Sequence, residues 1–178
     1  MSNEALRGID FTVRGVVNTD HGAYVVLIDE MSSMYFPVPC QSFHAALVEA
    51  ILSEKIDVTL ANYGLYFSLL SIFKAHDMSP TQIVFIVSPR GGVTCSMEVV
   101  ESNELGMKIS RIPMMLPDAV AISAIGKIPV VVYGSAGTMF TFKIGKDVPK
   151  QNVFSFVCEE IAKSERLASI GSSGQEQE

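Results

Sequence analysis

The sequence has few cysteines and no long apolar run. Three cysteines, Cys40, Cys95 and Cys158, are far apart and odd in number. This spacing is not that of a disulfide framework or a zinc site, and it favours reduced thiols among core residues. A membrane span needs ~18 consecutive apolar residues, whereas the longest runs here, such as residues 129–133, have the length of a strand. The sequence therefore predicts a protein that is not in a membrane.

An excess of basic residues is also missing. The formal net charge is −6, whereas a protein that binds nucleic acid by electrostatics is normally basic. A polyanionic substrate would therefore need a local basic patch or a bound cation. The first residues carry an acid, Glu4, and no apolar core follows them, so they lack the pattern of a secretory signal. We expect a cytoplasmic protein.

What the chain does contain is enough apolar material for a compact body. Hydrophobic residues make up 48% and charged residues 18% of the 178 positions, which exceeds the range in which chains remain unfolded. This length suits one domain with a full core. We expect a single domain over residues 1–168. The composition then turns to Gly, Ser, Gln and Glu, which predicts a disordered tail over residues 169–178.

Alternating apolar residues and turn residues predict strands, and apolar residues at helical spacing predict helices. Ser42 is a plausible N-cap of the first helix, and the second helix has almost no polar face, which favours packing on most sides. Pro117 in the first turn and Gly126 just past the end mark the two ends of the third helix. Turn residues between neighbouring strands predict a hairpin of residues 11–17 with 23–29 and another of residues 82–88 with 93–101, which residues 107–112 extend into a three-stranded meander. Meanders mixed with single helices indicate an α+β fold with a mixed, largely antiparallel sheet covered by helices. The expected strands are residues 11–17, 23–29, 34–38, 82–88, 93–101, 107–112, 129–133 and 138–144, and the expected helices are residues 42–54, 65–76, 117–125 and a last one capped by Asn152.

One segment carries a family resemblance. Residues 116–132 read Leu-Pro-Asp-Ala-Val-Ala-Ile-Ser-Ala-Ile-Gly-Lys-Ile-Pro-Val-Val-Val. They resemble the bifunctional nuclease family, in which Pro-Ser-Asp-Ala opens a short apolar helix that leads to an apolar strand introduced by Pro. The Phe36-Pro-Val sequence is similar to the family's strand before its first helix. The resemblance covers about residues 10–133 and leaves a strand and a helix at the C-terminal end outside it.

The resemblance implies a fold, an activity and a cofactor. It implies metal-assisted cleavage of phosphodiester bonds in DNA or RNA, with Mg²⁺ or Mn²⁺. The chain departs from the family at polar positions. The family's Ile-Asp-Ala-Arg run is here Ile-Pro-Met-Met at residues 112–115, its Thr-His-Asp is Tyr-Phe-Ser at residues 66–68, and its first-helix acid falls at His44.

Three residues form the candidate site. Asp118 is the candidate metal ligand or catalytic base, His44 the candidate acid or base, and Arg111 the candidate substrate-binding group that holds a phosphate. Each also has a purely structural interpretation. Asp118 would stabilise the start of a helix, His44 would cover the edge of the core, and Arg111 would form an ion pair with a nearby carboxylate.

Two functions remain open at this stage. The first is a metal-assisted nuclease or phosphodiesterase with nucleic acid as its partner. The second is a catalytically inactive interaction or regulatory domain on the same fold, with another protein or a second copy as its partner. The missing acidic and histidine positions and the acidic net charge favour the second.

Overall fold

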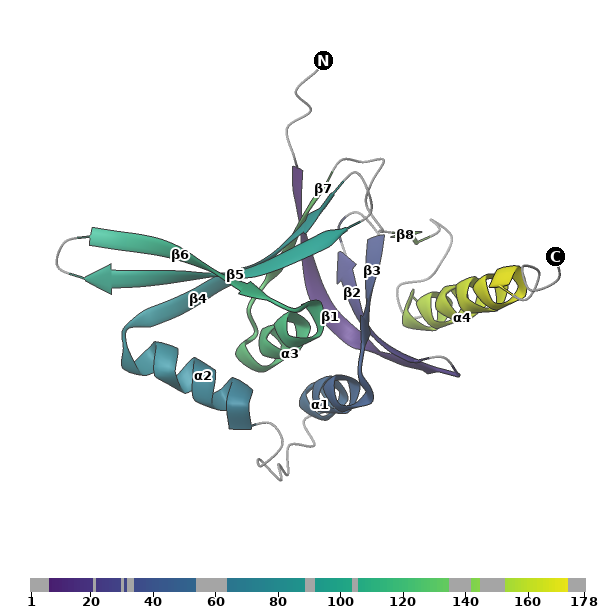
Figure 1. The fold of residues 1–178 in the computed structure, drawn as a ribbon, viewed down its shortest axis with the longest axis horizontal. Helices are drawn as coiled ribbons and strands as arrows, with labels where there is room; N and C mark the ends of the chain where they lie inside the picture. The colour runs from purple at the N-terminus through teal and green to yellow at the C-terminus, as the bar shows by residue number, and fades with distance from the viewer. Residues whose placement is uncertain are drawn as a thin grey trace, which may run out of the picture.

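The fold combines one mixed sheet with helices on both of its faces (Figure 1). The computed structural model describes residues 7–20, 22–29, 31, 34–53, 64–88, 92–103, 106–134, 142–144 and 153–172. In these residues the strands are β1 (Arg7–Thr19), β2 (Gly22–Asp29), β3 (Met34–Cys40), β4 (Met78–Val87), β5 (Val93–Asn103), β6 (Gly106–Met114), β7 (Val130–Gly134) and β8 (Phe142–Lys143). The helices are α1 (Ser42–Leu52), α2 (Gly64–Ala75), α3 (Leu116–Gly126) and α4 (Val153–Ser172).

The sheet follows the strand order β6-β5-β4-β7-β1-β2-β3-β8. Strands β4 and β7 are parallel, and the other neighbouring pairs are antiparallel. The predicted α+β class with a mixed, largely antiparallel sheet is therefore confirmed. Both predicted hairpins, β1–β2 and β4–β5, are present, and β6 completes the predicted meander.

A bulge in β1 decides which face of the sheet its side chains occupy. The register against β2 shifts between Val13 and Gly15, and an extra residue reverses the alternation that follows it. Phe11 therefore packs in the larger core, whereas Val17 packs in a second, smaller core. A larger residue in place of Gly15 would have to displace Phe154 of α4, because a Cβ at this position would lie 2.4 Å from the Phe154 ring.

The two cores lie on opposite faces of the sheet. The larger core fills the space between the sheet and helices α1, α2 and α3, and it includes the contacting rings of Phe11, Phe36 and Phe85. Helix α4 lies apart from these helices (Figure 1) and covers the smaller core with Val157 and Ile161. We call the sheet face that carries α1, α2 and α3 the helix face, and the opposite one the far face.

Helix α2 differs from its prediction. Of its residues, Tyr66 and Phe73 are buried, but Leu65 is 76% exposed and Ile72 is 54% exposed. Packing on most sides was therefore wrong. The helix lies at the edge of the layer and contacts mainly β4 and α3, so one side of it faces solvent whatever its composition.

Helix ends also differ from their predictions. The N-cap of α1 is Gln41 rather than Ser42, and the helix ends at Leu52. In α3 a proline occupies the first turn as predicted, but the left-handed position after the helix belongs to Lys127, with φ 52°, because Gly126 is still helical. Local capping preferences are weak compared with packing, and they place an end only to within a residue or two.

The C-terminal end is more regular than the composition suggested. Helix α4 continues to Ser172, so the first residues of the tail predicted over 169–178 are helical. The remaining residues of that tail lie outside the described part, as do Asn152 and most of the strand predicted over 138–144.

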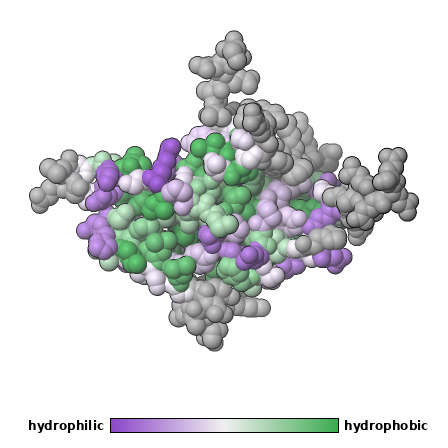
Figure 2. All heavy atoms as spheres, in the orientation of Figure 1, coloured by the Kyte–Doolittle hydropathy of each residue, from purple (hydrophilic) through white to green (hydrophobic). Residues whose placement is uncertain are grey.

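Apolar side chains reach the surface in several places. Figure 2 shows hydrophobic residues over much of the half of the molecule that carries α2 and the β4–β6 strands. Among the residues that the structure describes, no helix is long and apolar enough to cross a membrane. The largest exposed apolar side chains are Met31, Phe43, Leu52, Leu65, Ile72, Ile86, Met107, Ile109 and Met115.

Candidate functional site

Three helices bring three polar side chains together on the helix face. His44 comes from the first turn of α1, Tyr66 from the first turn of α2, and Asp118 from the first turn of α3. We call these three residues the Asp118 cluster. The sequence separations of 74 and 52 residues mean that tertiary packing alone makes these contacts.

One carboxylate oxygen accepts both hydrogen bonds of the Asp118 cluster. The Tyr66 hydroxyl donates to Asp118 Oδ1 at 2.5 Å, and His44 Nε2 lies 3.0 Å from the same oxygen. An ionised carboxylate can only accept, so Nε2 carries the proton of this bond. The side chain of Asp118 is 36% exposed, whereas that of His44 is 7% exposed. The buried side chains of Tyr66 and His44 therefore hold one oxygen of Asp118, while part of the carboxylate remains exposed to solvent.

The imidazole of His44 is incompletely satisfied. Its Nδ1 atom is buried and has no hydrogen-bond partner among the described residues. The ring of Phe43 packs against the imidazole ring, with ring centroids 3.7 Å apart. A buried polar atom without a partner costs about 1–3 kcal/mol, so this arrangement does not maximise stability.

Burial and the Asp118 charge act on neighbouring groups. Burial raises the pKa of the Tyr66 hydroxyl well above its usual value, and the hydrogen bond to Asp118 raises it further. Burial likewise raises the pKa of the Cys95 thiol to about 12, with a further contribution from the Asp118 charge. Both groups therefore stay protonated near neutral pH, and Tyr66 acts as a hydrogen-bond donor.

Arg111 does not join the Asp118 cluster, which corrects the predicted converging set. It follows Ser110 and precedes Ile112 in β6, and its side chain points to the far face because alternate residues of a strand face opposite sides. There Arg111 Nη2 lies 2.7 Å from Glu98 Oε1. The ion-pair interpretation of Arg111 is the one that the structure shows. A sheet separates Arg111 from Asp118, so it cannot hold a phosphate at that carboxylate.

Glu98 is the centre of a second polar cluster. The Gln82 side-chain amide donates to Glu98 Oε2, and Arg111 Nε donates to Glu98 Oε1 at 2.8 Å. We call Gln82, Glu98 and Arg111 the Glu98 cluster. The hydrogen bond from Gln82, together with Arg111, lowers the pKa of the Glu98 carboxyl against the opposing effect of burial. This cluster was not predicted, because the sequence predicted that its three strands pair but not the register that places these residues side by side.

The described residues offer few ligands for a metal ion. No group of three or more His, Cys, Asp or Glu side chains in this part of the chain is arranged to hold one. Mg²⁺ is usually held by one or two carboxylates and completes its shell with water and substrate phosphate oxygens. Asp118 has one oxygen that accepts no described hydrogen bond, so it could be the single carboxylate ligand of such a site. The other ligands would be water and substrate oxygens.

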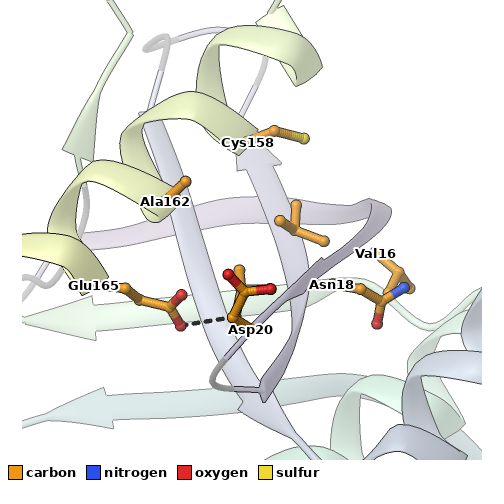
Figure 3. A pocket seen from close by; sticks show the side chains of 8 residues that line it. Val16, Asn18, Asp20, Cys158, Ala162 and Glu165 are labelled. Carbon is orange, nitrogen blue, oxygen red and sulfur yellow. Dashed lines mark hydrogen bonds between the residues drawn. The ribbon is translucent and has the colours of Figure 1, made fainter. Parts of the chain in front are cut away.

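Two hollows lie elsewhere on the molecule. One of about 380 Å³ lies between β1 and α4, where Thr19 donates to Glu165 at 3.0 Å and the Asp20 carboxylate lies nearby (Figure 3). The other, of about 420 Å³, is mostly apolar and has Lys127 and Ser123 at its wall. Neither is lined by a residue of the Asp118 cluster.

Sequence reasoning found two members of the Asp118 cluster and missed the third. Tyr66 was noted only as the residue in place of a family motif, because a tyrosine in an apolar helix is usually a core residue. Its position in the first turn of α2, which matches the positions of His44 and Asp118 in their helices, was the available signal.

No model of a protein family matches the chain, and no curated protein matches it.

Proposed function

We propose that the chain is a phosphodiester hydrolase that acts on DNA or RNA, with Asp118 as its catalytic group. The observation that carries this proposal is the convergence of Tyr66 and His44 on one oxygen of a partly exposed carboxylate. The resemblance to the bifunctional nuclease family supports it, since His44, Tyr66 and Asp118 stand at or beside the positions where that family has polar residues. Because this chain has different residues from the family at most of these positions, the role of each is derived from its own contacts.

Asp118 takes the proton of the attacking water, or binds a cation, through the oxygen that accepts no hydrogen bond from the described residues. Tyr66 and His44 fix the orientation of the carboxylate, because each holds a hydrogen bond to Oδ1. His44 is therefore a positioning residue rather than the acid or base that approaches the substrate, since its side chain is only 7% exposed.

Charge neutralisation at the phosphate needs a source other than Arg111. A divalent cation, Mg²⁺ or Mn²⁺, bound through Asp118 would neutralise the charge that develops on the phosphate oxygens. The protein's own contribution is a carboxylate of fixed geometry at the start of α3, where the helix amides make the local field positive. This field also favours an anionic substrate beside the helix end.

A cleavage assay with matched variants tests the proposal. Fluorogenic DNA and RNA are incubated with the wild type, Asp118→Asn and Glu98→Gln, with and without Mg²⁺ or Mn²⁺. We expect metal-dependent cleavage by the wild type and a loss of about 10²-fold or more in Asp118→Asn, as for a removed general base. Glu98→Gln makes the same chemical change on the far face and should cleave as the wild type does.

Two results would contradict the proposal. No cleavage by the wild type under any condition would refute it directly. Cleavage that survives in Asp118→Asn would belong to another site or to a contaminant. Calorimetric titration of Mn²⁺ into the wild type and Asp118→Asn gives a second readout, in which equal affinities would remove Asp118 as a metal ligand.

A second function has its own support. An inactive interaction or regulatory domain on the same fold fits the apolar side chains Leu65 and Ile72, which α2 exposes, and the separation of Arg111 from Asp118. It predicts a folded protein with no cleavage and with equal, negligible metal binding in the wild type and Asp118→Asn. The two assays above therefore distinguish the two functions.

A further inference from the structure

Strand β6 lies at one edge of the sheet. It runs over 9 residues, pairs with β5 on one side, and has no described strand on the other. Its backbone amides and carbonyls on that side are available to another strand, as in any edge strand. The β5–β6 hairpin reaches outward at the left of Figure 1, so that a second strand could approach the edge.

The features that usually block an edge strand are few in β6. Its pairing with β5 has no register shift, whereas β1–β2 and β4–β5 each contain one. Met107 is 76% exposed and Ile109 is 64% exposed, and both point to the far face. Pro113 stands near the end of the strand and leaves the stretch before it intact. A long, regular and apolar edge of this kind pairs readily with another strand.

The charges of β6 indicate what the second strand is. The strand has no acidic residue, and its two cations are Lys108 and Arg111. Arg111 is already compensated by Glu98, at 2.7 Å, so Lys108 is the remaining charge. An edge that is nearly neutral and apolar matches another copy of itself better than it matches an acidic strand.

Antiparallel pairing of β6 with its own copy also separates the cations. Directly opposed residues share a face, so one residue of the strand lies opposite its own copy and the two-fold axis passes between the two. With Ile109 opposite its copy, Lys108 lies opposite Ser110 and Arg111 opposite Met107. With Ser110 opposite its copy, Lys108 lies opposite Ile112. Both registers avoid the opposed like charges that destabilise strand pairs.

We propose that β6 is a homodimer interface, in which two copies of the chain join their sheets edge to edge through antiparallel β6 strands. Backbone hydrogen bonds join the strands, and the exposed Ile109 side chain of each copy becomes covered by the partner strand on the far face. The Asp118 cluster lies on the helix face and is not part of this interface. The inference is therefore independent of the proposed catalytic function.

Sedimentation across a concentration series tests the interface with a pair of matched variants. Ile109→Lys places a cation at the centre of the paired strands, whereas Ile86→Lys makes the same change on the far face of the central strand β4, where Ile86 is 40% exposed. We expect a wild-type dimer, an Ile86→Lys dimer, and a dissociation constant raised about 100-fold in Ile109→Lys by like-charge opposition. Thermal unfolding of each variant shows whether it is folded.

Cysteine cross-linking then reads the register. Opposed residues of antiparallel strands have Cα atoms about 4.5–5.5 Å apart, within reach of a disulfide. Either Ile109→Cys or Ser110→Cys should give a disulfide-linked dimer on mild oxidation, and Ile86→Cys should not. A wild type that remains monomeric at every concentration, or an Ile109→Lys protein that dimerises as the wild type does, would overturn the proposal.

Discussion

The Asp118 and Glu98 clusters lie on opposite faces of the same sheet and differ in how well they are satisfied. On the far face, both oxygens of Glu98 accept hydrogen bonds, one from Gln82 and one from Arg111. On the helix face, both donors of the Asp118 cluster bond to one oxygen, and Nδ1 of His44 has no described partner.

The difference indicates which cluster has a role beyond folding. The Glu98 cluster completes its hydrogen bonds across three neighbouring strands, and its cation is 65% exposed, as in an ordinary surface ion pair. The Asp118 cluster places polar groups among apolar helices and leaves one of them unpaired. An incompletely satisfied polar group in a core is one mark of a site for chemistry or binding, and for this reason we propose the function at Asp118.

The largest expected effect is on stability. Asp118→Ala leaves the Tyr66 hydroxyl and His44 Nε2 buried without an acceptor, and we expect it to lower the unfolding free energy by about 2–4 kcal/mol. Glu98→Ala leaves a mostly exposed arginine that water can solvate, and we expect a loss of about 1 kcal/mol or less. Urea denaturation of both variants measures the difference. Equal losses would show that the two clusters are equivalent.

Removing the whole Asp118 cluster should be less harmful than removing its centre. The triple variant His44→Leu, Tyr66→Phe, Asp118→Leu removes all three polar side chains of the Asp118 cluster, so none of them is left buried without a partner. We expect it to be about 2 kcal/mol more stable than Asp118→Ala in the same denaturation experiment. A triple variant less stable than the single one would mean that the polar groups contribute to stability, and would weaken the assignment of a function to the cluster.

The Glu98 cluster should stop stabilising the fold in acid. Because the pKa of Glu98 is lower in the folded protein than its ordinary value of 4.5, its stabilisation is present above 4.5 and is lost as the pH falls through the folded-state pKa. The difference in unfolding free energy between the wild type and Glu98→Gln should therefore shrink below about pH 4.5. A difference that does not change with pH would contradict the hydrogen-bonded, ionised state of Glu98.

The helix face should respond at the other end of the pH scale. The Cys95 thiol has a pKa of about 12 in the folded protein and 9.0 as its ordinary value. The contribution of this thiol to the free energy of unfolding is fully present below pH 9.0 and is lost as the pH rises towards about 12. The reason is that the thiol ionises at lower pH in the unfolded chain than in the folded protein. Comparing wild type and Cys95→Ala by denaturation over this range tests it. A constant difference would mean that the thiol is not desolvated.

Much of the local structure could be predicted from the sequence. The alternation of Cys95, Met97 and Val99 in β5 predicts three core side chains, and all three are buried. The first turn of α3 was predicted from its proline. The burial of α2 could not be predicted, because the sequence shows that Leu65 and Ile72 are apolar but not whether another element covers them.

The candidate site was also predictable only in part, because the sequence shows residue types but not how the elements pack. His44 and Asp118 were found by residue type and by resemblance, and the structure brings them to 3.0 Å. Tyr66 was not found, because its role depends on the angle at which α2 meets α3. Arg111 was placed incorrectly, because its position near Asp118 in the sequence does not reveal that β6 directs it to the far face.

By itself the sequence determined the periodicities of strands and helices, the hairpin turns and the α+β class, because these depend on residues close together along the chain. Only the tertiary structure decided the order of the strands, the bulge that sends Val17 to the second core, and the meeting of three helices at Asp118. Each of these joins residues distant in sequence, and the packing of the whole chain, rather than any local preference, selects them.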